Sequence, residues 1–438
     1  MSNEEIRKKV KKIMLDNVVR GYSKTFDYHF TYTKPSGKTY PFQYFWDTCI
    51  HIFILCGLKE FELAKDNLRS LFAMQAENGF VGHILYWNNI LPNRITDIFQ
   101  SQPGIKRNMR SHMSSLIQPP LAAQALERIY NDTGDEDFLR EMLPKLKKYY
   151  HWLAHNRDFD QDGMISIISY FEAGMDWKPS YDQLMNFEGQ ADWRLFLKVT
   201  WNDFENYLKN YDLRKIYQRG RFVVKDTGYN TIYVQNCRAM CKLCKISGDK
   251  EGDIFEQRAL KNLRNMVEKM YDQETKAFYD LNGKTNEQLK VKTPTIFFPV
   301  VIKGIPEEMG REVVETHFFR QNEFHSKYVI PSLSLDHPAF NPRHSMYIWR
   351  GPTWVVYNWF LHQFFLSEGY DQAAAHLILS IKELITKSGF REYYNPFSGE
   401  GYGARDFTWS GLIIDMLDMN PDQQFQKLSD IKNTRSIN

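Results

Sequence analysis

The hydrophobic pattern of this chain repeats one arrangement four times. Each unit begins with an apolar run of helical period, passes through a short polar turn that contains glycine, and continues into a second helical run. The four turns lie at Gly57, Gly134, Gly248 and Gly369. A segment rich in aromatic and polar residues follows each helix pair, and long inserts make the spacing between units irregular. The pattern predicts four antiparallel helix pairs, each with its own aromatic-rich excursion.

Strand-like patterns are short and few. They occur at residues 221–226 and 294–302, which is too little for a sheet of βαβ units. The sequence therefore predicts an all-α fold whose helices close into a ring, an (α/α) barrel, with loops at one end converging on a central pocket. A helical repeat array is the alternative architecture. We expect residues 1–438 to form a single domain, with a helical insert at residues 183–230 over one end and an amphipathic helix at residues 1–15.

Composition narrows the classes of partner. The chain of 438 residues has 56 lysines and arginines against 53 aspartates and glutamates, without a long block of one charge. Nucleic-acid binding, which requires a basic surface, is therefore not expected. The N-terminus lacks the apolar region of a signal peptide, and the longest apolar run, near residues 49–58, is too short to span a membrane. Five cysteines in a chain of this length do not make a disulfide framework, which favours a cytoplasmic location.

Residues 169–182, SYFEAGMDWKPSYD, place two carboxylates beside an aromatic residue. Glu172 and Asp176 precede Trp177 on a predicted loop, because glycine and proline interrupt any regular helix there. An acid against an aromatic wall can hold a proton at neutral pH, since loss of hydration raises its pKa. A loop capped by its own acids is the alternative interpretation.

Residues 389–409 form a second segment of acids and aromatic residues, without a leucine, isoleucine or valine. Glu392 beside Tyr393 and Tyr394 fits a general base that faces a water molecule. Glu400 lies between two glycines and fits a turn. An acid from each of the two segments together would meet the two-carboxylate requirement of glycoside hydrolysis.

Two tryptophan–charge pairs occur at the starts of predicted helices, Trp46–Asp47 and Trp349–Arg350. Aromatic residues make up 15% of the chain, a share that suits sugars, apolar ligands or interfaces. A tryptophan can stack on the apolar face of a sugar while the neighbouring charge binds its hydroxyl groups. Aromatic packing at a helix start is the alternative.

Two further motifs imitate metal sites. Cys237, Cys241 and Cys244 have the spacing of a radical-SAM iron–sulfur motif, but they fall on one face of a predicted helix and are interpreted as small buried residues. The hexapeptide DFDQDG, residues 158–163, imitates half of a calcium loop, but Ser169 stands where such a loop requires glutamate. A turn is predicted there instead, and we expect neither a metal nor a cofactor.

Five motifs carry a resemblance to a known family: YFWDTCIH, SLIQPPLAAQAL, EAGMDWKPSYD, YIWRGPTWVVYNWFL and REYYNPFSGEGYGARDFTWSGLIIDML. Their order resembles that of glycoside hydrolase family 63, and the chain length is similar to that of its bacterial and plant mannosylglycerate and glucosylglycerate hydrolases. The resemblance implies an (α/α)6 barrel and hydrolysis of an α-glycosidic bond with inversion. It implies Asp176 as the acid and Glu392 as the base, roughly 6.5–9.5 Å apart. It also implies a sugar pocket lined by Tyr40, Trp46, Asp47, Gln118, Trp349, Arg350 and Trp354.

The chain departs from the glycerate-specific members at Ile348, where they have tyrosine before WRGP. Its insert contains Arg214, Tyr217, Arg219 and Arg221 as candidates to hold a glycerate carboxylate. We therefore predict an inverting α-glycosidase acting on a small glucoside or mannoside, with glycerate or another sugar as the leaving group and with a homo-oligomer left open. The alternatives are a non-catalytic sugar-binding protein on the same fold and a terpene-cyclase-like α-barrel enzyme.

Overall fold

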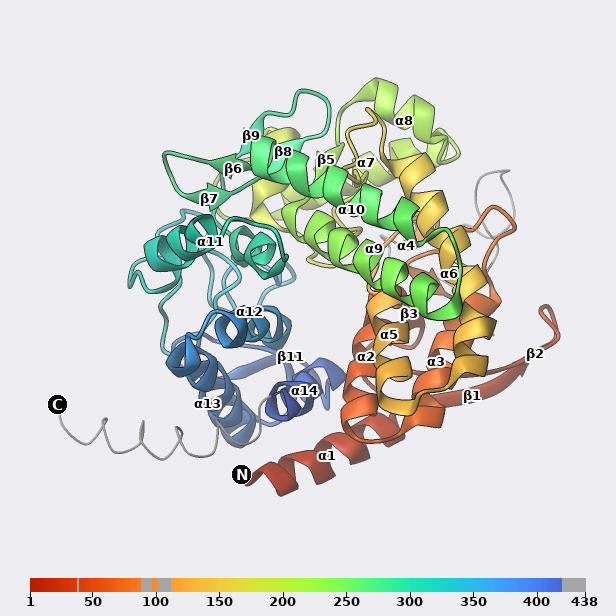
Figure 1. The fold of residues 1–438 in the computed structure, drawn as a ribbon. Coiled ribbons are helices and arrows are strands. Elements are labelled where there is room, and N and C mark those ends of the chain that lie inside the picture. The colour runs from red at the N-terminus through yellow and green to blue at the C-terminus, as the bar shows by residue number, and fades with distance from the viewer. Residues whose placement is uncertain (38, 88–96, 101–111, 420–438) are drawn as a thin grey trace.

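The structure, a computed structural model, describes residues 1–37, 39–87, 97–100 and 112–419. Helices dominate it (Figure 1), and the four predicted helix pairs are all present with their turns at the expected glycines. The pairs are α2 (Phe45–Gly57) with α3 (Phe61–Ala73), α5 (Ala122–Thr133) with α6 (Glu136–Arg157), α9 (Thr227–Ser247) with α10 (Gly252–Asn265), and α12 (Val355–Ser367) with α13 (Asp371–Ser388).

The turns use local chemistry that the sequence specifies. Gly134 and Gly248 end α5 and α9 with φ angles of 66° and 73°, a left-handed conformation that costs glycine little. Asp135 then caps α6 by accepting a hydrogen bond from the backbone N–H of Phe138. A cap of this kind contributes about 1 kcal/mol to helix stability.

The helices α2, α9 and α12 occupy the interior. Every residue of α2 from Phe45 to Cys56 is buried, and a helix that is apolar on all sides belongs in the core. The contacts between interior elements run from α2 to α5, from α5 to α9, and from α9 through the 3-10 segment η3 (Pro294–Val301) to α12. A second 3-10 segment, η5 (Thr408–Leu412), contacts both α12 and α2 and so completes the circuit.

The remaining helices pack around or between these elements. The predicted N-terminal amphipathic helix is α1 (Asn3–Asp16), which starts with a capping box formed by Ser2 and Glu5. The others are α4 (Asp97–Gln100), η1 (Pro179–Met185), α7 (Trp193–Leu208), α8 (Leu213–Arg219), η2 (Met266–Met270), α11 (Glu307–Val313), η4 (Val314–Phe318) and α14 (Ile413–Asp418). Within the described part of the chain, no helix has both the length and the apolar character needed to cross a membrane.

Small antiparallel sheets complete the fold. They pair β1 (Val18–Ser23) with β2 (Tyr28–Thr33), β3 (Gln43–Tyr44) with β4 (Ile84–Leu85), β6 (Tyr271–Asp272) with β7 (Ala277–Phe278), β10 (Arg391–Tyr394) with β11 (Gly401–Arg405), and β5 (Val224–Lys225) with β8 (Asp280–Asn282) and β9 (Gln288–Leu289). The interpretation of residues 294–302 as strand-like was wrong, because the two prolines of η3, Pro294 and Pro299, favour a 3-10 conformation over sheet pairing. The β1–β2 hairpin was not predicted.

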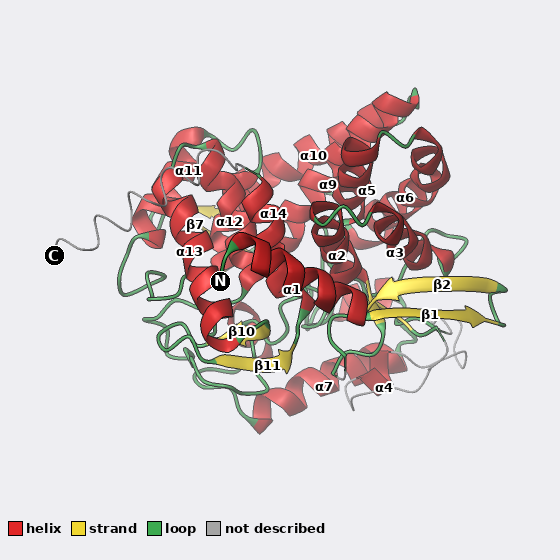
Figure 2. Ribbon diagram, turned by 90° about the horizontal axis from the view of Figure 1, so that it is seen from below, coloured by secondary structure: helices red, strands yellow, loops and turns green. Residues whose placement is uncertain are grey.

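Two helices and a hairpin lie along one edge of the molecule. In Figure 2, α7, α4 and the β10–β11 hairpin all lie along the lower edge of the view, below the rows of longer helices. Both α7 and α8 fall within residues 183–230, the segment predicted as a helical insert.

Candidate active site

A pocket of about 700 Å³, a volume that includes solvent at its mouth, brings together residues from distant parts of the chain. Eight of the nine site residues predicted from the sequence line it: Tyr40, Trp46, Asp47, Gln118, Asp176, Trp349, Trp354 and Glu392. They come from the start of α2, from loops, and from β10. Residues that follow the first, second and fourth helix pairs thus line one hollow together with both predicted catalytic carboxylates, whereas the excursion after the third pair, residues 272–283, does not line it.

Asp176 lies on a loop that buried ion pairs hold at both ends. On one side, Glu172 forms two hydrogen bonds of 2.5 and 2.9 Å with the guanidinium of Arg157, and both side chains are 0% exposed. On the other side, the Lys178 ammonium lies 2.6 Å from Asp226 and 2.7 Å from Asp280. Glu172 is therefore a structural acid, and Asp176, between the two anchors, is the carboxylate of this loop that reaches the pocket.

Gly174 lets this loop approach the pocket wall. Its φ angle is 73°, and a Cβ atom there would lie 2.7 Å from the indole ring of Trp46. Trp177, which follows Asp176, also has a positive φ of 65° although it carries a large side chain. Such strain, which costs about 1–3 kcal/mol, persists only where the surroundings enforce it.

Glu392 is held at the pocket by the β10–β11 hairpin. Its Oε2 atom accepts a hydrogen bond of 2.8 Å from the backbone N–H of Ala404. Its Oε1 atom accepts one of 2.5 Å from the Tyr40 hydroxyl. Both bonds favour the ionised carboxylate, which is the state that a general base requires.

Asp47 lies in the first turn of α2 and is almost fully buried. Burial raises its pKa to about 8, and the neighbouring carboxylate of Glu392 acts in the same direction. Asp47 is therefore predominantly protonated at neutral pH and can donate a hydrogen bond to a ligand hydroxyl. Next to it, the backbone N–H of Trp46 donates to Gln118 Oε1 over 3.1 Å, which leaves the amide NH2 group of Gln118 to act as a donor.

The floor of the pocket is a stack of aromatic rings. The rings of Trp349 and Trp354 are nearly parallel, with centroids 3.8 Å apart, and Tyr393 stacks on Trp354 at 4.9 Å. Trp409 packs edge-on against Trp46 at 4.7 Å. Flat apolar faces beside hydroxyl-binding groups match the two kinds of surface that a sugar ring presents.

Arg350 is the predicted site residue that does not line the pocket. Its guanidinium donates two hydrogen bonds, of 2.7 and 2.6 Å, to the carboxylate of Asp182, and it is 1% exposed. This pair lies behind the pocket wall, where it fixes the segment that carries Trp349.

Several other residues line the pocket, and two polar ones among them, His83 and Gln100, were not predicted as site residues. The His83 ring faces Ser114 Oγ at 2.5 Å through Nδ1, and burial lowers its pKa to about 3, so the ring is neutral. Gln100 at the end of α4 donates to Asp203 over 2.8 Å and also lines the pocket. The sequence around Gln100 contains no motif that would have identified it.

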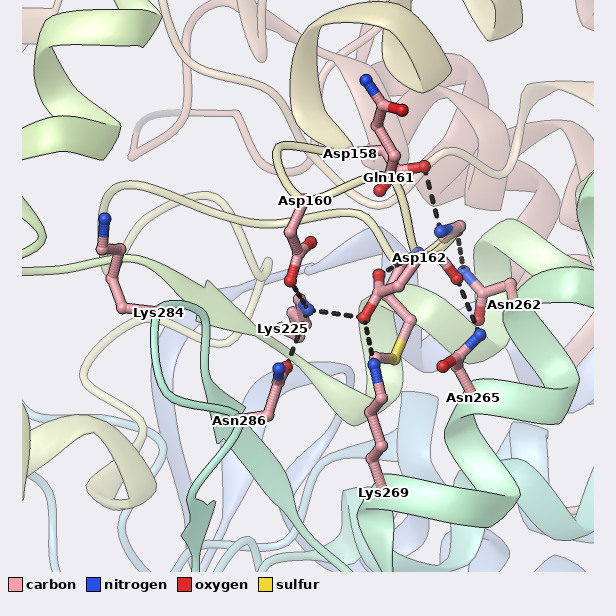
Figure 3. Close-up of polar contacts among 12 residues, drawn as sticks. Asp158, Asp160, Gln161, Asp162, Lys225, Asn262, Asn265, Lys269, Lys284 and Asn286 are labelled. Carbon is pink, nitrogen blue, oxygen red and sulfur yellow. Dashed lines mark hydrogen bonds and ion pairs between the residues drawn. The ribbon is translucent and has the colours of Figure 1, made fainter.

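The two metal-like motifs have structural explanations. Cys237, Cys241 and Cys244 are buried in α9 as free cysteines. The three aspartates of DFDQDG have carboxylate oxygens within 4.8 Å of one another, but lysine ammonium groups lie among them (Figure 3). Lys225 contacts Asp160 at 2.6 Å and Asp162 at 2.7 Å, and Lys269 contacts Asp162 at 2.8 Å. These cations neutralise the turn in the way a metal ion would.

None of the four candidates in the insert lines the pocket. Arg219 and Arg221 pair with Glu205. The Tyr217 ring stacks on Phe159 at 4.7 Å, and Arg214 lines a separate surface hollow.

Comparison with known proteins agrees with this geometry. Residues 40–410 match the family model described as the mannosylglycerate hydrolase MGH1-like glycoside hydrolase domain. The chain is 28% identical to the mannosylglycerate hydrolase of Thermus thermophilus, over 87% of this chain and 95% of that protein. It is 24% identical to the glucosylglycerate hydrolase of Mycolicibacterium hassiacum, over 88% of this chain and 93% of that protein.

Solved structures show the same fold. The family 63 mannosylglycerate hydrolase from Thermus thermophilus, in complex with Tris and D-glycerate, superposes with a TM-score of 0.79 at 24% identity, covering 94% of this chain and 99% of that one. The neutral trehalase Nth1 of Saccharomyces cerevisiae has a TM-score of 0.62 at 13% identity, covering 96% of this chain and 82% of that one. With most of its length matched by the family model, the chain belongs to the MGH1-like glycoside hydrolases of family 63 and is a glycosidase.

Proposed function

We propose that this glycosidase hydrolyses a small α-glucoside or α-mannoside with inversion of configuration, with Asp176 as general acid and Glu392 as general base. The observation that carries the proposal is the convergence of these two carboxylates, from a loop and a hairpin, on one aromatic-floored pocket. We also propose that the circuit of interior helices is an (α/α)6 barrel with this pocket at one end. The names of the relatives favour mannose or glucose as the sugar.

The proposed reaction needs one proton from the protein and one water molecule. Asp176 gives its proton to the glycosidic oxygen as the bond from that oxygen to the anomeric carbon breaks. Water attacks the same carbon from the opposite face, and Glu392 takes the proton of that water. The released sugar is then the β-anomer, and the two carboxylates exchange protons with solvent before the next turnover.

The other pocket residues would position the sugar. Protonated Asp47 and the Gln118 amide supply hydrogen-bond donors, and the stacked rings of Trp349 and Trp354 supply an apolar face. The proposal uses no metal and no cofactor. Membership of a hydrolase family does not favour the alternatives of a non-catalytic sugar-binding protein or a terpene-cyclase-like enzyme.

The test is to incubate the protein with α-glucosides and α-mannosides and to follow the anomeric proton of the released sugar by NMR. The β-anomer should appear first, and α-anomer first would refute inversion. Asp176→Asn and Glu392→Gln should each lower kcat by at least about 100-fold, the usual share of general acid–base catalysis. The isosteric controls Glu136→Gln and Asp137→Asn, both exposed on α6, should leave kcat unchanged. Sugar binding without turnover in the unmodified protein would support the non-catalytic alternative.

A further inference from the structure

A second and larger hollow, which we call the outer chamber, opens from the catalytic pocket. It encloses about 1510 Å³, including solvent, compared with about 700 Å³ for the pocket. The two hollows share Tyr40, Phe171, Ile348 and Glu392 as lining residues, so they are continuous. The space beyond the carboxylates is therefore larger than the space that holds the sugar itself.

The outer chamber lies between the two catalytic segments. Trp177, which directly follows Asp176, forms part of one wall, and the β10–β11 hairpin that carries Glu392 forms part of the other. A general acid must contact the glycosidic oxygen that it protonates. The group attached to that oxygen is the leaving group, and the chamber that opens from the pocket beside Trp177 offers space for it.

The wall beside the acid is aromatic and rigid. The Trp177 ring lies nearly parallel to Phe196 of α7, at 25° and 6.1 Å between centroids. Phe171 and Tyr347 pack edge-on against Trp177 at 5.4 and 5.2 Å. The inserted segment thus contributes an aromatic ring to the chamber.

The facing wall is also aromatic. Tyr402 lies 6.0 Å from Tyr393 and 5.8 Å from His344, measured between ring centroids, and all three line the chamber. Aromatic rings on two sides suit a flat, partly apolar unit such as a pyranose ring.

The charges in the outer chamber do not favour an anion. Among the described residues that line it, Glu392 and Glu400 are acidic and Arg391 is basic. The Arg391 guanidinium already donates to the backbone carbonyls of Tyr402 and Gly403. None of the insert cations expected to hold a carboxylate is among these lining residues, so a carboxylate would face more negative than positive charge from the described lining of the chamber.

We propose that the outer chamber binds the leaving group and that this group is a neutral sugar ring, not a small carboxylate such as glycerate. The inference rests on the proposed glycosidase function and narrows its substrate class. The substrate is then an α-linked disaccharide or a short oligosaccharide, whose second ring lies between Trp177 and the hairpin. Ile348, an apolar residue shared by both hollows, fits this assignment because its side chain offers no hydrogen bond to a carboxylate.

The test compares substrates that differ only in the leaving group. Purified enzyme is assayed for kcat/KM with glucosylglycerate, with glucosylglycerol, and with the disaccharides trehalose, kojibiose and nigerose. Mannosylglycerate, mannosylglycerol and α-linked mannobiose form the parallel series. Glucosylglycerate and glucosylglycerol differ in one carboxylate, so their ratio measures the effect of charge alone. The α-glucosyl and α-mannosyl fluorides, which carry no organic leaving group, report the hydrolytic step by itself.

We expect at least one disaccharide to exceed the matching glycerate by about tenfold or more, the gain that aromatic contacts of this kind supply. Glucosylglycerol should be no worse than glucosylglycerate. Phe196→Ala should lower the ratio of disaccharide to fluoride turnover by about tenfold, whereas Leu197→Ala, its exposed neighbour on α7, should not change that ratio.

Four results would count against the inference in different ways. A preference for glucosylglycerate over glucosylglycerol, or for the mannose pair in the same sense, would overturn the neutral leaving group. An equal effect of Phe196→Ala on every substrate would overturn the stacking role of the insert. Failure to hydrolyse any substrate or fluoride would overturn the proposed function itself, whereas fluoride turnover without a disaccharide preference would overturn only the present inference.

Discussion

Replacing Gly403 with alanine should displace the proposed catalytic base by a calculable amount. Gly403 has a φ angle of 63°, and a Cβ atom there would lie 2.4 Å from Glu392 Oε2, whereas an ordinary contact is 3.4 Å or longer. The carboxylate oxygen must therefore move by about 1 Å, or the hairpin must open by as much. A misplacement of about 1 Å in a catalytic group can cost about 100-fold in rate. The alanine side chain also adds about 1–2 kcal/mol of backbone strain.

The control separates displacement from strain. Gly134 has nearly the same φ angle, 66°, and a Cβ atom there would contact nothing within 4 Å. Gly134→Ala should therefore lose stability in thermal unfolding but keep its kcat, while Gly403→Ala should lose both stability and about 100-fold of kcat. Comparable melting temperatures with kcat within about twofold of the unmodified enzyme in Gly403→Ala would refute the role of this hairpin in placing Glu392.

Three further variants test other parts of the structure. Burial raises the pKa of Asp47 to about 8, so the stability that its protonated form provides is present at low pH and is lost as pH rises from about 4 through 8. Asp47→Asn should weaken this pH dependence of the melting temperature and should lower activity. An unchanged pH profile of the melting temperature would contradict the burial argument. Lys225→Met should leave the aspartates of DFDQDG without their central cation. The melting temperature of this variant should fall, and added calcium should restore it. A rise in the melting temperature of the unmodified protein with calcium would show that the lysine does not replace a metal. Arg350→Met should destabilise the fold by roughly 3–5 kcal/mol, measured by chemical denaturation. Adding Asp182→Leu to this variant should restore much of the lost stability. A loss of sugar affinity without a loss of stability would instead place the guanidinium in the binding site.

The helical pairs and the pocket residues were predictable because both depend on local patterns. Glycine between two amphipathic runs specifies a turn wherever the chain goes, and the turns at Gly57, Gly134, Gly248 and Gly369 all separate helices in the structure. Aromatic residues beside acids cannot be accommodated on an aliphatic core face. Their segments were therefore expected to line a hollow, and Asp176 and Glu392 do line one.

Other features depend on partners that are distant in sequence. Glu172 and Asp176 look equivalent in the segment EAGMD, and only the buried guanidinium of Arg157 separates the structural acid from the pocket acid. The same holds for Arg350, whose pairing with Asp182 depends on where the 3-10 segment η1 lies relative to the segment that carries Trp349. Gln100 lines the pocket and donates a side-chain hydrogen bond to Asp203 of α7, a contact that no local sequence pattern indicates.

Three residues beside the catalytic pocket break local rules, and similar features occur elsewhere in the described chain. These residues are Trp177, which has a positive φ angle, Asp47, which is buried close to two other carboxylates, and Gly403, which leaves room for an oxygen of Glu392. Each of them disfavours folding locally. A fold selected only for stability would replace such groups with less costly ones, since a hydrophobic residue at Asp47 would avoid the desolvation of a carboxyl group. These costly groups therefore fit the proposed catalytic role of the pocket, and the buried ion pairs of Arg157 and Lys178 hold the loop that carries Trp177 in place.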